Sequence, residues 1–234
     1  MNLTIQPNER FLIIAPHADD ESIGCGGLML RYGPQGDILL LTDGRKGYDS
    51  RIDTVDEDAL ARTREAELHR AAGMCGIRSV TCLGLPDGSV SQNAKRILET
   101  DITGYDYIFV PNLSERHKDH RAAAELAHTM KRRQHARAQI YQYEVWSPIP
   151  DPTMVLDISD VMAQKKELVS QFRSQIKYVD YVRMTCGLNQ YRGVAFGCDY
   201  AEVYAPLIRK SPLRRLYDRL PTSIRRVLHR LLRK

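Results

Sequence analysis

The sequence predicts an α/β protein with a Rossmann-like, three-layer α/β/α fold built around a mostly parallel sheet. Short apolar runs of strand length recur along the chain, and segments with the three- and four-residue spacing of a helix separate them. The apolar runs are continuous and do not alternate with polar residues, which is typical of parallel strands covered on both faces. These patterns leave the order of the strands in the sheet open.

The first half of the chain supplies two strand–helix pairs. Residues 11–15 read Phe-Leu-Ile-Ile-Ala and predict a buried strand, and residues 21–32 predict the helix that follows it. Residues 37–42 form a second apolar run. The segment 56–74 is rich in Ala, Glu, Arg and Leu at helical spacing, and Gly76 supplies its stop signal. This alternation is the basis for predicting parallel strands.

The second half continues the alternation more weakly. Residues 80–83 and 107–110 predict a third and a fourth strand, and residues 118–135 predict a helix. Residues 139–146 are rich in aromatic and β-branched side chains and predict a fifth strand. The proline-rich stretch 148–152 is interpreted as a turn and not as a linker between domains.

Composition points to one cytoplasmic domain. With 234 residues, 43% of them apolar, the chain can bury a core of its own without disulfides, and we place that domain at residues 1–208. The five cysteines are odd in number and lack Cys-x-x-Cys spacing, which favours reduced thiols. Neither a signal peptide nor an apolar run of transmembrane length is visible, so we expect a cytoplasmic protein.

The C-terminal residues 209–234 differ from the rest of the chain in charge. They contain ten lysines and arginines against one acid, a net charge of +9, so the remaining residues are mildly acidic at −4 within the total of +5. Apolar residues recur there at three- and four-residue spacing, which is typical of a basic amphipathic helix on an anionic membrane surface. Packing against the domain is the alternative. Nucleic-acid binding is disfavoured because no known binding module is present.

Two polar clusters carry the predicted chemistry. His17, Asp19 and Asp20 follow the first strand, and His117 and His120 follow the fourth. Ligand sites in such sheets lie beyond the carboxyl ends of the strands, so the clusters should meet. Two histidines and one carboxylate suit zinc or another borderline divalent ion, and a spare carboxylate could accept a proton from water. Taken singly, each cluster could equally be a solvated turn or a helix cap.

A glycine-rich segment follows the first cluster. Residues 24–27 read Gly-Cys-Gly-Gly, which invites comparison with a phosphate-binding loop. The segment lacks Gly-x-Gly-x-x-Gly spacing, and the acidic residues before it would repel phosphate. Close packing of the helix on a strand explains these glycines better.

These motifs resemble those of the PIG-L/LmbE-like deacetylases of N-acetylglucosamine derivatives. The similarity begins at Ala15-Pro16-His17-Ala18-Asp19-Asp20-Glu21, continues through the second motif, His117-Lys118-Asp119-His120, and covers about residues 10–205. Ala18 departs from the family pattern, in which proline is usual. Further matching segments lie at Thr42-Asp43-Gly44, Arg64-Glu65-Ala66-Glu67, Leu85-Pro86-Asp87-Gly88, Tyr143-Glu144-Val145-Trp146, Ser174-Gln175 and Tyr200-Ala201-Glu202.

The resemblance implies a role for each matching residue. His17, Asp20 and His120 would be the metal ligands, with zinc expected and ferrous iron the alternative. Asp19 would be the general base, and His117 would polarise the acetyl carbonyl or protonate the leaving amine. Asp119 would orient a histidine.

Two further positions are expected to bind hydroxyl groups of the sugar. The resemblance assigns this role to Arg64 and Asp87. For Arg64 the alternative is an ion pair with Glu65 or Glu67 on a helix surface, and for Asp87 it is an ordinary Pro-Asp-Gly turn.

Three functions remain open from the sequence. The first is a zinc-dependent deacetylase acting on an N-acetylhexosamine, free or lipid-linked, at the inner face of a membrane if residues 211–234 bind lipid. The second is an amidase with another N-acyl substrate. The third is a non-catalytic membrane- or nucleic-acid-binding module with the same fold. The combination of a metal-ligand set with a spare carboxylate favours an enzyme.

Overall fold

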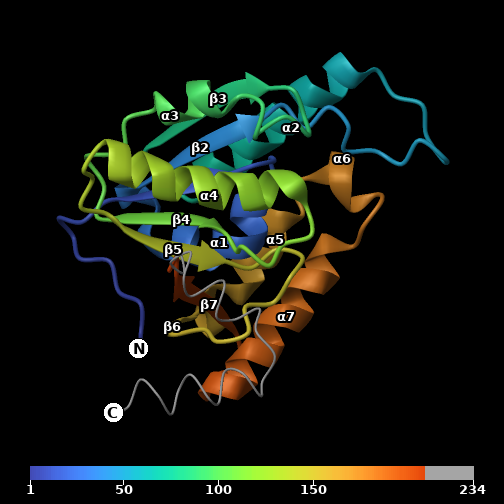
Figure 1. The fold of residues 1–234 in the computed structure, drawn as a ribbon. Helices are drawn as coiled ribbons and strands as arrows, with labels where there is room; N and C mark the ends of the chain where they lie inside the picture. The colour runs from blue at the N-terminus through green and yellow to red at the C-terminus, as the bar shows by residue number, and fades with distance from the viewer. Residues whose placement is uncertain (209–234) are drawn as a thin grey trace, which may run out of the picture.

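The computed structural model describes residues 1–208, so the basic tail predicted at 209–234 lies outside the described residues. A seven-stranded sheet forms the middle layer, and helices cover both of its faces (Figure 1). The strand order is β3-β2-β1-β4-β5-β7-β6. The strands are β1 (Phe11–Ala15), β2 (Gly36–Thr42), β3 (Ser79–Leu85), β4 (Tyr107–Pro111), β5 (Gln139–Tyr143), β6 (Met154–Asp157) and β7 (Ala201–Pro206).

The predicted fold class is confirmed. Strands β1 to β5 pair in parallel, and only β6 and β7 run antiparallel to their neighbours. The α-helices are α1 (Asp20–Tyr32), α2 (Glu57–Met74), α3 (Ala94–Leu98), α4 (Lys118–Arg133), α5 (Met162–Val169), α6 (Arg173–Ile176) and α7 (Tyr181–Phe196).

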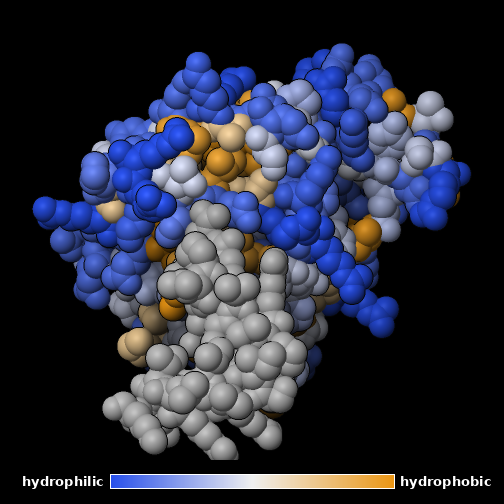
Figure 2. All heavy atoms as spheres, viewed as in Figure 1, coloured by the Kyte–Doolittle hydropathy of each residue, from blue (hydrophilic) through white to orange (hydrophobic). Residues whose placement is uncertain are grey.

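Alternate residues of the central strands feed two separate cores. Phe11 and Ile13 of β1 pack in one cluster with side chains of α1, α2 and α5, whereas Leu12 and Ile14 pack in the other with α3 and α4. A strand buried on both faces must be apolar at every position, which explains the continuous run at 11–15. The face seen in Figure 2 is mainly hydrophilic, because the apolar side chains lie between the layers.

The predicted elements of the N-terminal half are found with small shifts. Helix α1 begins at Asp20 and is kinked at Cys25, whose backbone is not helical. Asp56 caps α2 by accepting hydrogen bonds from the backbone N–H groups of Asp58 and Ala59. The fifth strand is shorter than predicted: it ends at Tyr143, and residues 144–146 lie in an irregular segment outside the sheet.

The C-terminal third was not predicted in detail. Strands β6 and β7 and helices α5 to α7 all lie there. Asn2 forms a parallel β-bridge with Val155 of β6, and the backbone N–H of Leu3 donates a hydrogen bond to the carbonyl of Val155 at 2.7 Å. The N-terminal residues thus cover the edge strand β6, which would otherwise expose unpaired backbone groups.

The glycines of α1 are explained by close packing, as predicted. A Cβ atom on Gly24 would lie 2.2 Å from Cδ2 of Tyr143, and one on Gly27 would lie 2.3 Å from Cγ2 of Ile158. Neither position has room for a side chain. These contacts bring α1 close to the sheet, and with it the residues at its N-terminus.

A buried ion pair fixes the second half of α1. Glu202 of β7 accepts hydrogen bonds from the backbone N–H groups of Gly27 (2.6 Å) and Leu28 (3.0 Å), just beyond the kink. Nζ of Lys165 donates to Glu202 at 2.6 Å and to Oδ1 of Asn189 at 2.8 Å. Both charged side chains are almost completely buried. The interaction joins α1, α5, α7 and β7.

Replacing Glu202 with glutamine should therefore destabilise the protein strongly. The ammonium group of Lys165 would remain buried without its counter-charge, which costs about 3–5 kcal/mol of unfolding free energy. Equilibrium urea unfolding followed by circular dichroism would measure the change. The matched control is Asp160→Asn, which removes the solvent-exposed ion pair with Arg31 and should cost less than about 1 kcal/mol. A comparable loss in the two variants would contradict the prediction.

Candidate metal centre and active site

The two predicted clusters meet at the carboxyl edge of the sheet. The chain leaves β1 for β2 on one side and reaches β4 on the other, so the strand order reverses between β1 and β4. His17 and Asp20 follow β1, and His120 lies in the first turn of α4 after β4. A reversal of this kind leaves a crevice above the strand ends where ligands bind.

Three ligand atoms converge in this crevice. Nδ1 of His17 lies 3.3 Å from Nε2 of His120 and 3.3 Å from Oδ2 of Asp20. The third side of the triangle, from Nε2 of His120 to Oδ2 of Asp20, measures 3.2 Å. The same carboxylate oxygen accepts a hydrogen bond from the backbone N–H of His17 at 2.9 Å, which fixes the loop. All three side chains are buried.

This triangle fits a tetrahedral metal ion. Nitrogen and oxygen ligands about 2.1 Å from a tetrahedral zinc ion are separated from one another by about 3.4 Å. The observed separations of 3.2–3.3 Å among His17, Asp20 and His120 are close to that value. Two imidazoles and one carboxylate also suit zinc or ferrous iron in chemistry and leave a fourth position for water or substrate.

His117 lies beside the triangle. Its ring centroid is 4.7 Å from that of His17 and 5.1 Å from that of His120, and ligand nitrogens of the three rings lie within 4.8 Å of one another. Burial, followed by the neighbouring His17 and His120, lowers the pKa of His117. Its imidazole is therefore neutral near pH 7 and can receive a proton.

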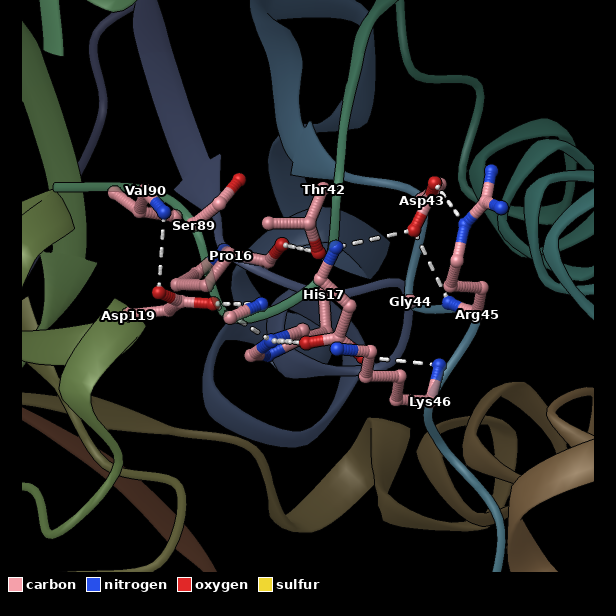
Figure 3. Close-up of polar contacts among 12 residues, drawn as sticks. Pro16, His17, Thr42, Asp43, Gly44, Arg45, Lys46, Ser89, Val90 and Asp119 are labelled. Atoms are coloured by element: carbon pink, nitrogen blue, oxygen red, sulfur yellow. Dashed lines mark hydrogen bonds and ion pairs between the residues drawn. The ribbon is translucent and has the colours of Figure 1, made fainter. Parts of the chain in front are cut away.

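Two more aspartates face the opposite nitrogen of His17. Oδ1 of Asp87 lies 3.3 Å and Oδ2 of Asp119 lies 3.6 Å from Nε2 of His17. Asp119 is held in place by the backbone N–H groups of Gly88 (2.8 Å) and Val90 (3.2 Å), as Figure 3 shows for Val90. The placement agrees with the expectation that Asp119 orients a histidine, and it adds Asp87 to the same contact.

The carboxylates control the protonation of His17. Burial by itself disfavours the charged imidazole, but Asp119, Asp20 and Asp87 outweigh it and raise the pKa of His17 well above its usual value. For Asp20 the net shift has the opposite sign. Burial alone would raise the pKa of Asp20, but the contacts with His120 and His17 outweigh burial and lower it. The cluster therefore attracts positive charge strongly, whether a proton or a metal ion.

Asp19 is the spare carboxylate of the site. Its backbone has a φ of 139°, which is unusual outside glycine and costs roughly 1–3 kcal/mol. Burial raises the pKa of its carboxyl group to about 7, although Arg64 opposes the shift. A pKa near 7 suits a group that takes up and releases protons at neutral pH, and a divalent cation beside it would lower that value.

Arg64 is buried and holds this part of the site together. Its guanidinium donates to Oδ2 of Asp19 (3.1 Å), to the carbonyl of Ala18 (2.9 Å) and to the carbonyl of Gly44 (3.0 Å). The alternative of a surface ion pair with Glu65 or Glu67 is wrong, because the arginine side chain is only 4% exposed and is paired with Asp19.

Sequence reasoning missed Glu115. This residue is buried, and its Oε1 accepts hydrogen bonds from the backbone N–H groups of Trp146 (3.0 Å) and Ser147 (3.1 Å). Its Oε2 lies 3.8 Å from Nδ1 of His120, on the side of the ring away from the triangle. Burial raises the pKa of Glu115. The available signal was an acidic residue between the end of a strand and the His117–His120 motif.

The site opens into a pocket with a volume of about 580 Å³. Of the predicted site residues, only Asp119 does not line it, because it lies behind His17. Trp146, Gln175 and Tyr181 also line this pocket, although the sequence suggested no role for them. The plain-turn alternative for Asp87 is therefore incomplete, since its carboxylate faces both His17 and the pocket.

A second group with metal-binding side chains lies on the surface. It consists of Glu65, His69 and Cys82, of which the first two are exposed. It lies on α2 and the edge strand β3, away from the strand reversal between β1 and β4. The His17 cluster is the better candidate for catalysis, and His69 is a convenient control for it.

Comparisons with known proteins agree with this geometry. The family described as PIG-L, GlcNAc-PI de-N-acetylase, matches residues 12–131. A curated relative, the 1D-myo-inositol 2-acetamido-2-deoxy-alpha-D-glucopyranoside deacetylase of Kineococcus radiotolerans, is 35% identical over 85 residues. These residues make up 34% of this chain and 24% of the relative, so the match spans about a quarter of that protein.

Solved structures confirm the fold. A conserved protein of Thermus thermophilus is 26% identical, with a TM-score of 0.71 over 87% of this chain and 98% of that one. The N,N'-diacetylchitobiose deacetylase of Pyrococcus horikoshii is 21% identical, with a TM-score of 0.72 over 92% of each chain. The family match covers half of the chain, including all the motif residues from His17 to His120. The chain therefore belongs to the PIG-L family of deacetylases.

Proposed function

We propose that this protein is a zinc-dependent hydrolase that removes the N-acetyl group from an N-acetylhexosamine of the N-acetylglucosamine type, present in a saccharide or glycoconjugate. The observation that carries the proposal is the triangle of ligand atoms from His17, Asp20 and His120, with sides of 3.2–3.3 Å, in a pocket that Asp19 also lines. Family membership supports the reaction type. Residues 1–208 are proposed as the deacetylase domain.

The metal ligands are His17, Asp20 and His120. A bound zinc ion would supply a Lewis acid that polarises the amide carbonyl and makes water more acidic. Ferrous iron fits the same three ligands and is the alternative. The carboxylate of Asp119 keeps His17 in the orientation that presents Nδ1 to the metal.

Asp19 acts as the general base. Its buried carboxylate accepts the proton of the attacking water, and Arg64 fixes the oxygen that does not take part. His117 lines the pocket on the α4 side, where the N–H of its neutral imidazole can donate a hydrogen bond to the developing oxyanion. To protonate the leaving amine, the ring must first take up a proton released during the reaction, such as the one that Asp19 accepts from water.

Asp87 and Arg64 are the proposed contacts to sugar hydroxyls. The side chain of Asp87 is 11% exposed and that of Arg64 only 4%. Arg64 also donates three hydrogen bonds to protein oxygens. Asp87 therefore offers more free surface to a substrate.

An amidase with another N-acyl substrate is the second candidate, since the site defines the reaction better than the acyl chain. A non-catalytic binding module is disfavoured, because it has no need of a strained, buried base beside the metal ligands. Acetate release from N-acetylglucosamine conjugates, compared with release from other N-acyl amines, separates these functions.

A lipid-linked substrate is a further part of the proposal. Its support is the sequence of residues 209–234, with a net charge of +9 and amphipathic spacing, which favours the anionic inner face of a membrane. No helix in the described part of the chain is long and apolar enough to span a membrane.

The first test of the mechanism is Asp19→Asn. The variant keeps the size of the side chain but cannot accept the proton, so kcat for acetate release should fall by at least about 100-fold. Zinc content, measured on the same samples, should stay at one ion per chain. Asp160→Asn, at an exposed aspartate that forms a surface ion pair with Arg31 away from the pocket, is the matched control and should retain activity. Full activity of Asp19→Asn would rule out the assigned base.

Zinc affinity should depend on pH through His17. The ring must lose its proton to bind metal, and its raised pKa lets the proton compete with the metal at a higher pH than it would on an ordinary histidine. The affinity should fall by about tenfold for each pH unit below that pKa. Competition with a chelator over a pH range that extends from about 5.5 to about 9, on both sides of the ordinary histidine pKa, would measure it. His69→Ala should show the same slope, and a pH-independent affinity would contradict the assignment of His17.

Deletion of residues 211–234 should abolish binding to anionic liposomes, because the basic charge is concentrated there. Turnover of a soluble amino sugar should be preserved. Sedimentation with vesicles of phosphatidylglycerol and phosphatidylcholine measures the binding, and vesicles of phosphatidylcholine alone are the control. Equal binding by the truncated and the full chain would show that the tail is not the membrane anchor.

A further inference from the structure

One carboxyl group of the first motif takes no part in the proposed reaction. Glu21 follows directly after Asp20, and its side chain is completely buried. It is not among the residues that line the pocket, so it is not placed to touch a substrate. Among the described residues no lysine, arginine or histidine forms an ion pair with it. A buried carboxyl group without a counter-charge is costly, which indicates that Glu21 serves a purpose of its own.

Two hydrogen bonds connect this carboxyl group to its neighbours in the chain. Oε2 of Glu21 accepts a hydrogen bond from the backbone N–H of Asp19 at 3.1 Å, and Oε1 accepts one from the hydroxyl of Ser22 at 2.6 Å. Both bonds lie at the N-terminus of α1, where backbone N–H groups have no acceptor within the helix. Glu21 therefore contacts the proposed base through the main chain of Asp19.

Asp19 occupies the N-cap position of α1, but its side chain does not cap the helix. An aspartate at an N-cap normally accepts a hydrogen bond from a backbone N–H two or three residues ahead. The carboxylate of Asp19 instead accepts one from Arg64 and lines the pocket. The contact from Glu21 resembles the other half of a capping box, in which a first-turn glutamate reaches back to the N–H of the N-cap residue. Glu21 thus holds the helix end and leaves the carboxylate of Asp19 free for chemistry.

The strained backbone of Asp19 is held on both sides. Its N–H donates to Glu21, and its carbonyl accepts hydrogen bonds from the backbone N–H groups of Ser22 (3.1 Å) and Ile23 (2.9 Å). A φ of 139° persists in a residue with a side chain only where the surrounding contacts enforce it. With the backbone in this conformation, the consecutive residues Asp19 and Asp20 both line the pocket.

We infer that Glu21 is a positioning residue, which holds the strained backbone of Asp19 and so aims the carboxylate of the base into the pocket. The inference rests on the proposed function, because it takes Asp19 as the general base. Glu21 acts by accepting a hydrogen bond from a main-chain N–H, so its role needs an oxygen and not a negative charge. Loss of that oxygen should slow the chemical step without weakening the binding of substrate.

The test measures kcat and KM for acetate release by Glu21→Met and Glu21→Gln, with zinc content and thermal unfolding recorded for each protein. Methionine fills a similar space without an oxygen, so kcat should fall at least about tenfold while KM changes less than about twofold, because a misplaced base slows the reaction. Glutamine keeps an acceptor and should stay within about threefold of the wild type. Asp56→Ala, which removes the N-cap of α2, is the matched control and should lower stability but not kcat.

A double-mutant cycle decides whether Glu21 acts through Asp19. In an Asp19→Asn background, Glu21→Met should lower the residual rate by less than about twofold, because the group that Glu21 positions is already inactive. Ser22→Ala is a milder second variant, since it removes only the hydroxyl that donates to Glu21. It should lower kcat at least about threefold in the wild-type background and have no effect beside Asp19→Asn.

Three results would overturn the inference while leaving the deacetylase intact. These are an unchanged kcat in Glu21→Met, the same loss from Glu21→Met in both backgrounds, and the same loss in Glu21→Gln as in Glu21→Met. If the methionine variant does not fold, an unchanged kcat in Ser22→Ala overturns it. No acetate release by the wild type, or full activity of Asp19→Asn, would instead overturn the proposed function, and this inference with it.

Discussion

Four buried aspartates lie close together around His17 and Arg64, and their mutual repulsion is the constraint that shapes the site. The side chains of Asp19, Asp20, Asp87 and Asp119 are between 1% and 11% exposed. Carboxylates so far from bulk water remain charged only where opposite charge or hydrogen-bond donors surround them.

Arg64, His17 and backbone N–H groups together compensate the four carboxylates. Arg64 donates to Asp19, and backbone N–H groups after Pro86 hold Asp119. His17 contacts the other three aspartates through its two ring nitrogens. A divalent cation at the triangle of ligand atoms would relieve the remaining repulsion, so metal binding and the stability of the site are expected to depend on each other.

Elements far away in the sequence fix the positions of the proposed metal ligands. Glu202 of β7, itself neutralised by Lys165, fixes α1 just beyond its kink and so positions the first turn that carries Asp20. One carboxylate oxygen of Glu115 holds the backbone of Trp146, and the other lies near His120. Glu115 therefore anchors both a wall of the pocket and the surroundings of a proposed metal ligand.

Local sequence patterns were sufficient to predict the fold class, the first five strands and the meeting of the two motifs. These depend on local patterns: continuous apolar runs predict strands buried on both faces, and polar residues after parallel strands must lie at one edge of the sheet. The motifs His17–Asp20 and His117–His120 predicted a metal centre because both follow parallel strands and so lie at the same edge of the sheet. The packing glycines of α1 were also interpreted correctly.

The remaining features of the fold and the site depend on contacts between residues far apart in the sequence. The strand order and the C-terminal elements depend on pairings between distant segments, as do the contact of Arg64 with Asp19 and that of Glu115 with the segment at Trp146. The family resemblance placed Arg64 in the sugar site, but nothing in the sequence paired it with Asp19, because Glu65 and Glu67 offered nearer partners of the right charge. Burial and long-range partners arise from packing, which periodicity and motif spacing do not encode.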